Sequence, residues 1–122
     1  MNFKRNLSAP SFFARIYISG PVGVIKQTCR HWCKANPSCV NISKTSFIYH
    51  GGEETGACVE LLNYPKFPSS ESEIFEKAKD LGFKLKEDTA QDSFLIVTPE
   101  LTHWWSDREQ TWTLSEMTRS AL

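Results

Sequence analysis

The sequence predicts a single small domain of the α+β class, with strands in one layer and helices in a second layer. Four stretches alternate apolar and polar residues, which is the period of a β-strand, or are rich in β-branched residues. Two other stretches repeat apolar residues every three or four positions, which is the period of a helix. The connections between these stretches are short, and 122 residues with 40% hydrophobic content can build one small core.

The first strand is expected over residues 12–18, where aromatic and β-branched residues alternate with others. Ala14, Ile16 and Ile18 would share one face of this strand. Arg15 and Tyr17 would lie on the opposite face. The apolar face should meet the helices, so the sequence predicts that Arg15 and Tyr17 lie on the uncovered side of the sheet.

The first helix is expected over residues 22–36, following Pro21, which suits a helix start, and ending before Pro37. Its apolar stripe consists of Val22, Ile25, Cys29, Trp32 and Cys33. Its other side carries basic residues at every fourth position, which are Lys26, Arg30 and Lys34. The helix is therefore amphipathic, with a positively charged outer side.

A long hairpin is expected next. Its strands cover residues 39–44, resuming over 46–49, and residues 57–63. Residues 50–56 between them contain three glycines and should form a loop that visits positive φ. A connection with two prolines follows at residues 64–68.

The second helix should begin at Ser70, because Ser70 and Glu73 have the spacing of a capping box. Its apolar stripe consists of Ile74, Ala78, Leu81 and Leu85. The last strand is expected over residues 93–98 and should end at Pro99. The second half of the chain thus repeats the helix–strand alternation of the first half.

The resulting order, β-α-β-β-α-β, is that of a ferredoxin-like two-layer sandwich, with a four-stranded antiparallel sheet and both helices on one face. We expect an N-terminal arm over residues 1–11, the ferredoxin-like domain over 12–99 and an aromatic C-terminal tail over 100–122. The tail has room for a short helix. It holds three of the four tryptophans, which are Trp104, Trp105 and Trp112. Tryptophans are seldom left in water, so the tail should dock on its own sheet or on another subunit.

The formal net charge is zero, but the charges are unevenly distributed along the chain. The first 52 residues include seven basic and no acidic residues, and all 14 acids follow. One interpretation is a basic surface that receives an anion, such as a nucleotide or a nucleic acid. The other is that the two halves neutralise each other, within one chain or between subunits.

The cysteines and histidines do not form a recognisable catalytic or metal motif. Cys29 and Cys33 have the spacing of half a zinc site, but Cys39 and Cys58 do not form a second pair. No export signal is readable, so we expect reduced thiols and a cytoplasmic protein. The three histidines, His31, His50 and His103, lack the neighbours that acid–base phosphodiester chemistry would require. We therefore expect no catalytic residue, no metal and no cofactor.

Ile16-Tyr17-Ile18-Ser19-Gly20 resembles the first-strand motif of RNA recognition motif domains, in which an aromatic ring stacks on a base. The expected third strand lacks the aromatic rings of that family, and Glu60 would add a negative charge where phosphates pass. RNA binding, like a hydrolase activity, is thus a third hypothesis.

The segments at residues 49–56 (YHGGEETG) and 63–68 (NYPKFP) resemble a family of small uncharacterised proteins of tailed bacteriophages. The resemblance covers about residues 15–105. It implies an accessory viral protein in the cytoplasm of an infected bacterium.

From these observations we expect a non-enzymatic viral protein that counters host defence by sequestering a small anionic, nucleotide-type ligand. The ligand-binding residues would come from the first strand, the glycine hairpin and the tail, and are Arg15, Tyr17, Tyr49, His50, Gly51, Gly52, Glu53, Trp104, Trp105 and Arg108. The alternative is a protein–protein inhibitor of a host enzyme, with the tryptophans as anchors. We also expect a homo-oligomer without membrane contact.

Overall fold

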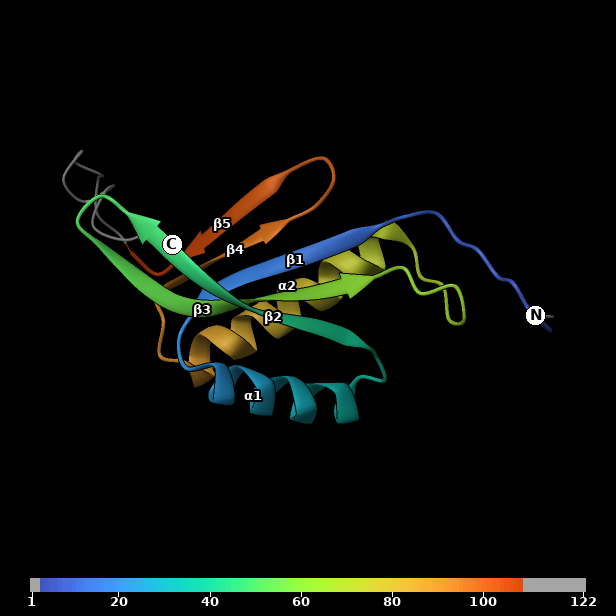
Figure 1. Ribbon diagram of the computed structural model, residues 1–122, viewed down its shortest axis with the longest axis horizontal. Helices are drawn as coiled ribbons and strands as arrows, with labels where there is room; N and C mark the ends of the chain where they lie inside the picture. The colour runs from blue at the N-terminus through green and yellow to red at the C-terminus, as the bar shows by residue number, and fades with distance from the viewer. Residues whose placement is uncertain (1–2, 109–122) are drawn as a thin grey trace.

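Five antiparallel strands form one sheet, and two helices pack against one of its faces in the computed structural model, which describes residues 3–108 (Figure 1). The elements are β1 (Phe13–Ser19), α1 (Val22–Ala35), β2 (Val40–Tyr49), β3 (Gly52–Leu62), α2 (Glu71–Asp88), β4 (Ser93–Val97) and β5 (Thr102–Ser106). Their order in the sheet is β2-β3-β1-β4-β5, and every pair is antiparallel. The two-layer α+β architecture is confirmed, but the expected four-stranded sheet is corrected to five strands.

The core lies between the sheet and the helices, as the alternation in β1 predicts. Ala14, Ile16 and Ile18 are fully buried beneath the helices. The predicted stripe of α2 is also buried, and it consists of Ile74, Ala78, Leu81 and Leu85. Burying such side chains contributes about 1.5–3 kcal/mol each, so this layer interface is the main source of stability.

The two helices are also joined by polar contacts across their interface. Trp32 donates from its indole nitrogen to Asp80 at 2.8 Å, and Thr28 donates to Asp88 at 2.7 Å. The predicted capping box of α2 is present, with Ser70 accepting from the Glu73 backbone N–H and the Glu73 side chain accepting from the Ser70 N–H. Neither helix of the described residues is long and apolar enough to cross a membrane.

The β2–β3 hairpin is longer and its turn is tighter than the sequence predicts. Tyr49 pairs with Gly52, so only His50 and Gly51 form the turn, and Gly51 has a φ of +99°. The expected loop over residues 50–56 is therefore wrong, because most of it continues β3. Glycines and adjacent acids have low strand propensity, and only the pairing with β2 makes this segment a strand.

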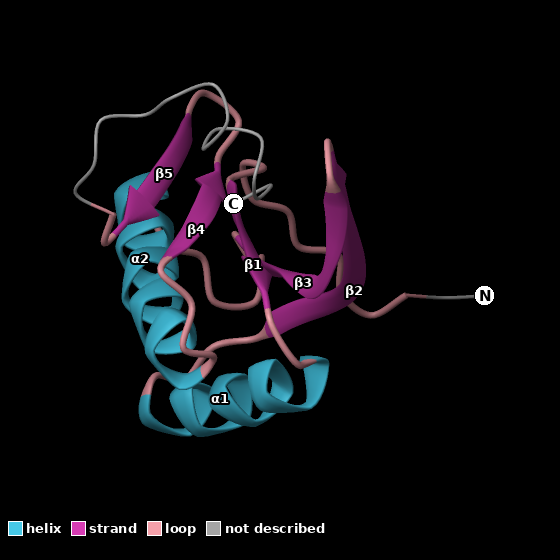
Figure 2. Cartoon of the chain, turned by 90° about the vertical axis from the view of Figure 1, so that its left-hand side faces the viewer, coloured by secondary structure: helices cyan, strands magenta, loops and turns pink. Residues whose placement is uncertain are grey.

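The sheet is curved, with the β2–β3 ribbon on one side of β1 and the β4–β5 ribbon on the other (Figure 2). Gly56 permits part of this curvature. A Cβ at this position would lie 2.1 Å from the Ile18 carbonyl oxygen, a distance no side chain tolerates. The backbones of β1 and β3 approach closely at this point because residue 56 has no side chain.

The expected tail contributes the fifth strand. β5 pairs with β4 along its whole length, from Ser93 opposite Ser106 to Val97 opposite Thr102. The tail thus docks on the sheet of its own chain, and it does so by backbone pairing as well as by its rings. The short helix and Trp112 expected further along the tail lie outside the described residues.

Candidate functional site

The uncovered face of the sheet, which we call the open face, collects the polar and aromatic side chains that alternate with the core residues. The strand register aligns Tyr17 with Cys58 on one side and with Leu95 on the other. Ser43 of β2 lies opposite Cys58, and Trp104 of β5 lies opposite Leu95. Directly opposed residues share a face. One surface therefore carries side chains from all five strands, and it is the face on which the sequence predicts a ligand.

Arg15 lies on the open face as predicted, but it is paired with a carboxylate. Its Nε is 2.6 Å from Glu60, which lies directly opposite on β3, and Asn41 of β2 donates to the other Glu60 oxygen at 3.4 Å. The Arg15 guanidinium also stacks 4.2 Å above the Phe13 ring. The interpretation of a basic surface that receives an anion is therefore corrected at this position, where Glu60 neutralises Arg15.

Tyr17 lies at the centre of the open face, edge-on to the Phe47 ring at a centroid distance of 6.4 Å. Burial, with a hydrogen bond to Cys58, raises the pKa of Tyr17 above its usual value. The phenol is therefore protonated at neutral pH. The pKa of the Cys58 thiol is also raised, mainly by burial, so this pair offers a neutral hydroxyl and a neutral thiol rather than a nucleophile.

Glu54 and Glu53 are neighbours on β3, and their side chains leave the strand on opposite faces. Glu54 pairs with Phe47 and lies on the open face, where it accepts a hydrogen bond from Ser19 at 2.7 Å. Glu53 pairs with Ile48 and lies on the other face. Glu53 is the residue that the sequence predicts at the site, and Glu54 is not predicted there, because three glycines in residues 50–56 indicate a loop rather than a strand. The open face thus holds two carboxylates, those of Glu54 and Glu60.

The two tail tryptophans are also separated by strand alternation. Trp104 lies on the open face, and the Arg108 guanidinium is 5.9 Å from its ring. Arg108 forms a two-pronged pair with Asp92 at 2.8 Å. Trp105 faces the helices instead and packs on Phe83 at 5.4 Å. Trp104 and Arg108 are thus near the predicted site, and Trp105 belongs to the core side.

The predicted hairpin residues lie at the far end of the β2–β3 ribbon. The Tyr49 ring folds over Gly52. A Cβ at residue 52 would lie only 3.2 Å from the Tyr49 hydroxyl. Tyr49 shares a face with Phe47 and Glu54, whereas His50 and Gly51 form the exposed turn. This end of the ribbon therefore forms the border of the open face rather than its centre.

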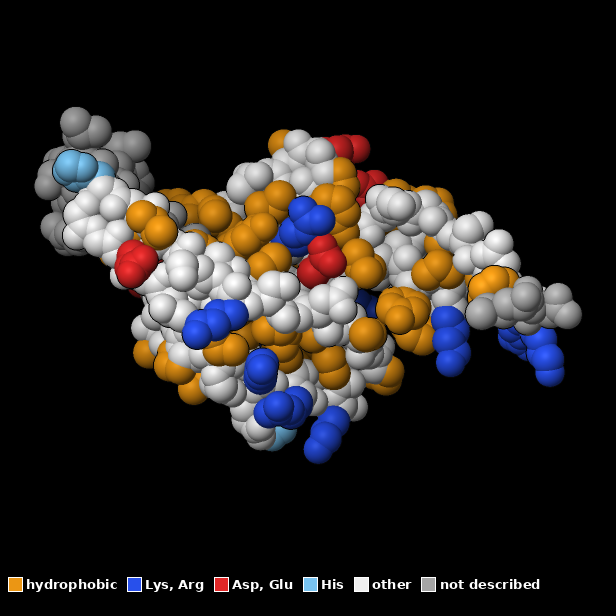
Figure 3. Space-filling view, in the orientation of Figure 1, with side chains coloured by type: hydrophobic (Ala, Val, Ile, Leu, Met, Phe, Trp, Pro, Cys, Tyr) orange, Lys and Arg blue, Asp and Glu red, His pale blue; other side chains and the backbone are white. Residues whose placement is uncertain are grey.

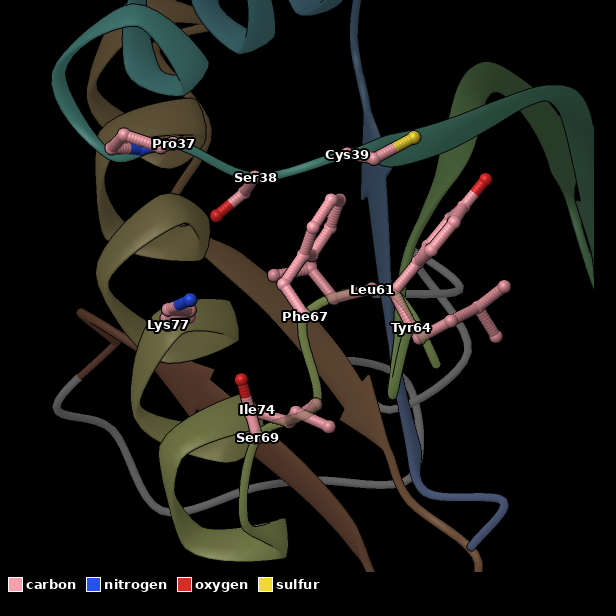
Figure 4. Close-up of a pocket in the computed structure, with 10 residues that line it drawn as sticks. Pro37, Ser38, Cys39, Leu61, Tyr64, Phe67, Ser69, Ile74 and Lys77 are labelled. Carbon is pink, nitrogen blue, oxygen red and sulfur yellow. The ribbon is translucent and has the colours of Figure 1, made fainter. Parts of the chain in front are cut away.

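One cavity lies at the other end of the molecule, between the 64–68 connection and α2 (Figure 4). Tyr64 and Phe67 are stacked beside it at 5.1 Å, and Ser38 and Lys77 line it. Its volume is about 30 Å³, enough for one or two water molecules. This cavity is too small to hold a nucleoside.

The cysteines are separate thiols in the structure. Residues 3–108 contain no group of three side chains that could hold a metal ion. Burial raises the pKa of Cys29 to about 12, which makes this thiol unreactive near neutral pH.

Comparison with protein-family models gives no match, and a search of curated proteins gives none either. Two solved structures are similar in fold, and both are of phage SAM (S-adenosylmethionine) lyase. The structure of the apo state has a TM-score of 0.64 and 17% sequence identity, and the match covers 91% of this chain and 100% of that chain. The complex with S-methyl-5'-thioadenosine has a TM-score of 0.60 and 18% identity, with 90% of this chain and 100% of that chain covered.

These comparisons support the resemblance to small phage proteins, and they correct one expectation. We expected a binding protein without catalytic activity, but both structures with this fold are of an enzyme. The expectation of a nucleotide-type ligand is supported, since one of these structures holds a nucleoside derivative. At 17–18% identity the likeness extends to the fold, and the chain therefore shares the architecture of phage SAM lyase.

Proposed function

We propose that this protein is a lyase that cleaves S-adenosylmethionine and releases S-methyl-5'-thioadenosine, with the open face as its substrate site. The observation that carries the proposal is the joint presence of two carboxylates and several aromatic rings on the open face of a fold shared with phage SAM lyase. The residues involved are Tyr17, Phe47, Glu54, Glu60 and Trp104.

The substrate has groups that match these side chains. Its sulfonium is a cation, which aromatic faces attract by about 0.5–2 kcal/mol. Its ribose hydroxyls and its ammonium group are hydrogen-bond donors, and the carboxylates of Glu54 and Glu60 are acceptors. Arg15 would hold the Glu60 carboxylate in place through its 2.6 Å contact. Its side chain is 40% exposed, so its remaining donors can also reach the substrate carboxylate.

The reaction needs no oxidant, reductant or water. The bond between the sulfonium sulfur and the γ-carbon of the methionine part breaks, and its electron pair leaves with sulfur as the neutral thioether. The four-carbon fragment is completed in one of two ways. Either its own carboxylate oxygen bonds to the γ-carbon and closes a lactone, or a carboxylate of the open face accepts a proton from the β-carbon. In the second case the electron pair of the broken C–H bond forms a double bond between the β- and γ-carbons. The positive charge on sulfur is dispersed in both cases, so water solvates the transition state less strongly than the ground state.

The test is incubation of the purified full chain with S-adenosylmethionine, with chromatography to quantify S-methyl-5'-thioadenosine. We expect its formation, and ¹H NMR of the other product distinguishes the lactone from the alkene. Tight binding of S-adenosylmethionine without any product would contradict the lyase.

Two variants of β3 test the site. Glu60→Gln should lower kcat/KM about 10- to 100-fold, the range expected when a hydrogen bond to a charged group is lost. Glu53→Gln removes the same charge from the opposite face and should change kcat/KM less than twofold. Equal losses in both variants, with unchanged thermal unfolding, would place the site elsewhere.

A further inference from the structure

The outer side of α1 carries basic side chains that form no ion pair with a carboxylate in the described part of the chain. Lys26, Arg30 and Lys34 follow one another at every fourth position, and all three are exposed. Lys44 on β2 is exposed as well. None of these four side chains forms an ion pair within residues 3–108. The two oppositely charged halves of the chain therefore do not neutralise each other along α1, and the surface stays basic (Figure 3).

A groove separates this basic side of α1 from β2. Its volume is about 530 Å³. Cys29, Cys33, Val40 and Ile42 form its apolar floor, and Lys26 and Arg30 form its rim. No aromatic ring lines it, so it lacks the stacking platform that nucleic-acid bases use.

The strand beside the groove is an edge of the sheet. In the described part of the chain β2 pairs with β3 alone, over the ten residues from Val40 to Tyr49. An edge strand retains unpaired backbone N–H and C=O groups, and these can pair with an extended segment of another chain. The groove thus offers backbone pairing, an apolar floor and positive charge side by side.

A second copy of this chain is not the best match for the basic side of α1. Three acids of α2 already have partners in their own chain. Glu73 completes the capping box, Glu76 pairs with Lys79 at 3.1 Å, and Asp80 accepts from Trp32. The charged residues of α1 and β2 are all basic, so charge complementarity points to an acidic partner.

We propose that the β2 edge and the adjoining groove bind an extended, acidic segment of another protein by strand addition. The segment would pair with the β2 backbone. Its helix-side residues would place apolar groups over Val40 and Ile42, and carboxylates against Lys26 and Arg30. This surface lies at the β2 edge on the helix side of the sheet, and the open face proposed for S-adenosylmethionine lies on the opposite side.

The probe is a fluorescein-labelled peptide, Glu-Thr-Val-Thr-Glu-Thr-Val-Thr-Glu, whose odd positions share one face of a strand. Fluorescence anisotropy with the full chain should show binding that weakens as salt rises, because the contacts include exposed charges. The variant Lys26→Gln/Arg30→Gln should bind about five- to tenfold more weakly, as expected for two exposed ion pairs. The control Lys66→Gln/Lys84→Gln removes two charges outside the groove and should bind like the unmodified protein.

Two further probes make the test decisive. The same peptide with N-methyl groups on alternate amides keeps every side chain but cannot pair as a strand on its methylated edge. Two such peptides are made, one methylated on each edge of the strand. One of the two, the peptide whose methylated edge would face β2, should not bind. Equal binding of both versions would overturn strand addition. The acidic-peptide partner would be overturned if no peptide bound at 1 mM, which is about the weakest affinity of interest. It would also be overturned if a dT12 oligonucleotide bound more tightly than the peptide and lost this binding in Lys26→Gln/Arg30→Gln.

Discussion

Arg15 illustrates how one neighbour changes the chemistry of a site residue. Strand alternation correctly predicts its face, but the Glu60 carboxylate at 2.6 Å converts a free cation into half of an ion pair. The hydrogen bond to Glu60 also raises the pKa of Arg15, so the guanidinium stays charged. Because strand alternation also places Glu60 on this face, the register of β1 against β3 was the missing information.

The cysteines give a prediction at the same scale. Iodoacetamide at pH 8 should modify Cys39, which is exposed, and should leave Cys29 unmodified in the folded protein. The physical reason is that burial raises the pKa of Cys29 to about 12, so almost no thiolate forms at pH 8. Peptide mapping by mass spectrometry after a timed reaction measures both sites.

The control for the thiol reaction is the same protein in 6 M guanidinium chloride, where both cysteines should react at similar rates. Rapid modification of Cys29 in native buffer would show that α1 opens readily or that the thiol is not buried.

At the scale of elements, α2 contains a glycine that packing requires. A Cβ at Gly82 would lie 2.5 Å from the Phe94 ring of β4. Replacing Gly82 with alanine gains about 1 kcal/mol of helix propensity. Overpacking a core costs about 1–3 kcal/mol, so the net effect of Gly82→Ala should be destabilising by up to about 2 kcal/mol. Urea denaturation followed by circular dichroism measures the difference.

The matched substitution is Gly23→Ala in α1, where a Cβ meets nothing within 4 Å. Only the propensity gain applies there, so this variant should be more stable by about 0.5 kcal/mol. Stabilisation by both substitutions would mean that Phe94 moves aside without cost, contrary to the tight packing of α2 on β4.

At the scale of the whole molecule, the pair between Asp92 and Arg108 closes the β4–β5 ribbon at its base. The hydrogen bond from Arg108 lowers the pKa of Asp92 below its usual value of 3.8. A group with a lowered pKa stabilises the folded state above its unfolded pKa, and this contribution is lost as pH falls through the folded value. The pair should therefore stabilise the protein at pH 7 and lose its effect below about pH 4.

Asp92→Asn tests this directly. The variant should have a lower urea midpoint than the unmodified protein at pH 7, and the two midpoints should converge as the pH is lowered towards 2. Glu100→Gln, at a carboxylate in the β4–β5 connection that forms no ion pair among the described residues, should leave the midpoint unchanged. A difference for Asp92→Asn that is constant with pH would assign the effect to packing rather than to charge.

The assembly of the molecule is a separate prediction. We expect a homo-oligomer, since large apolar side chains such as Ile48 and Leu101 are 77% and 61% exposed in one chain. Light scattering of the full chain at several concentrations measures the mass. A value of 13.9 kDa throughout would show a monomer.

Local patterns of the sequence predict the alternation of β1, the stripe of α2, the capping box at Ser70 and therefore the two-layer architecture. They predict the stripe of α1 in part, because Ile25, Cys29 and Trp32 are buried whereas Val22 and Cys33 are half-buried. These features depend on local periodicity and on contacts within a few residues, which one sequence contains. Tertiary structure alone decided the rest. Residues 52–56 form a strand because they pair with β2, and this pairing places Glu54 on the open face. Residues 102–106 form β5 because they pair with β4, and this pairing places Trp104 and Trp105 on opposite faces. Such outcomes depend on the register between segments far apart in the chain, and a shift of one residue moves every side chain to the other face.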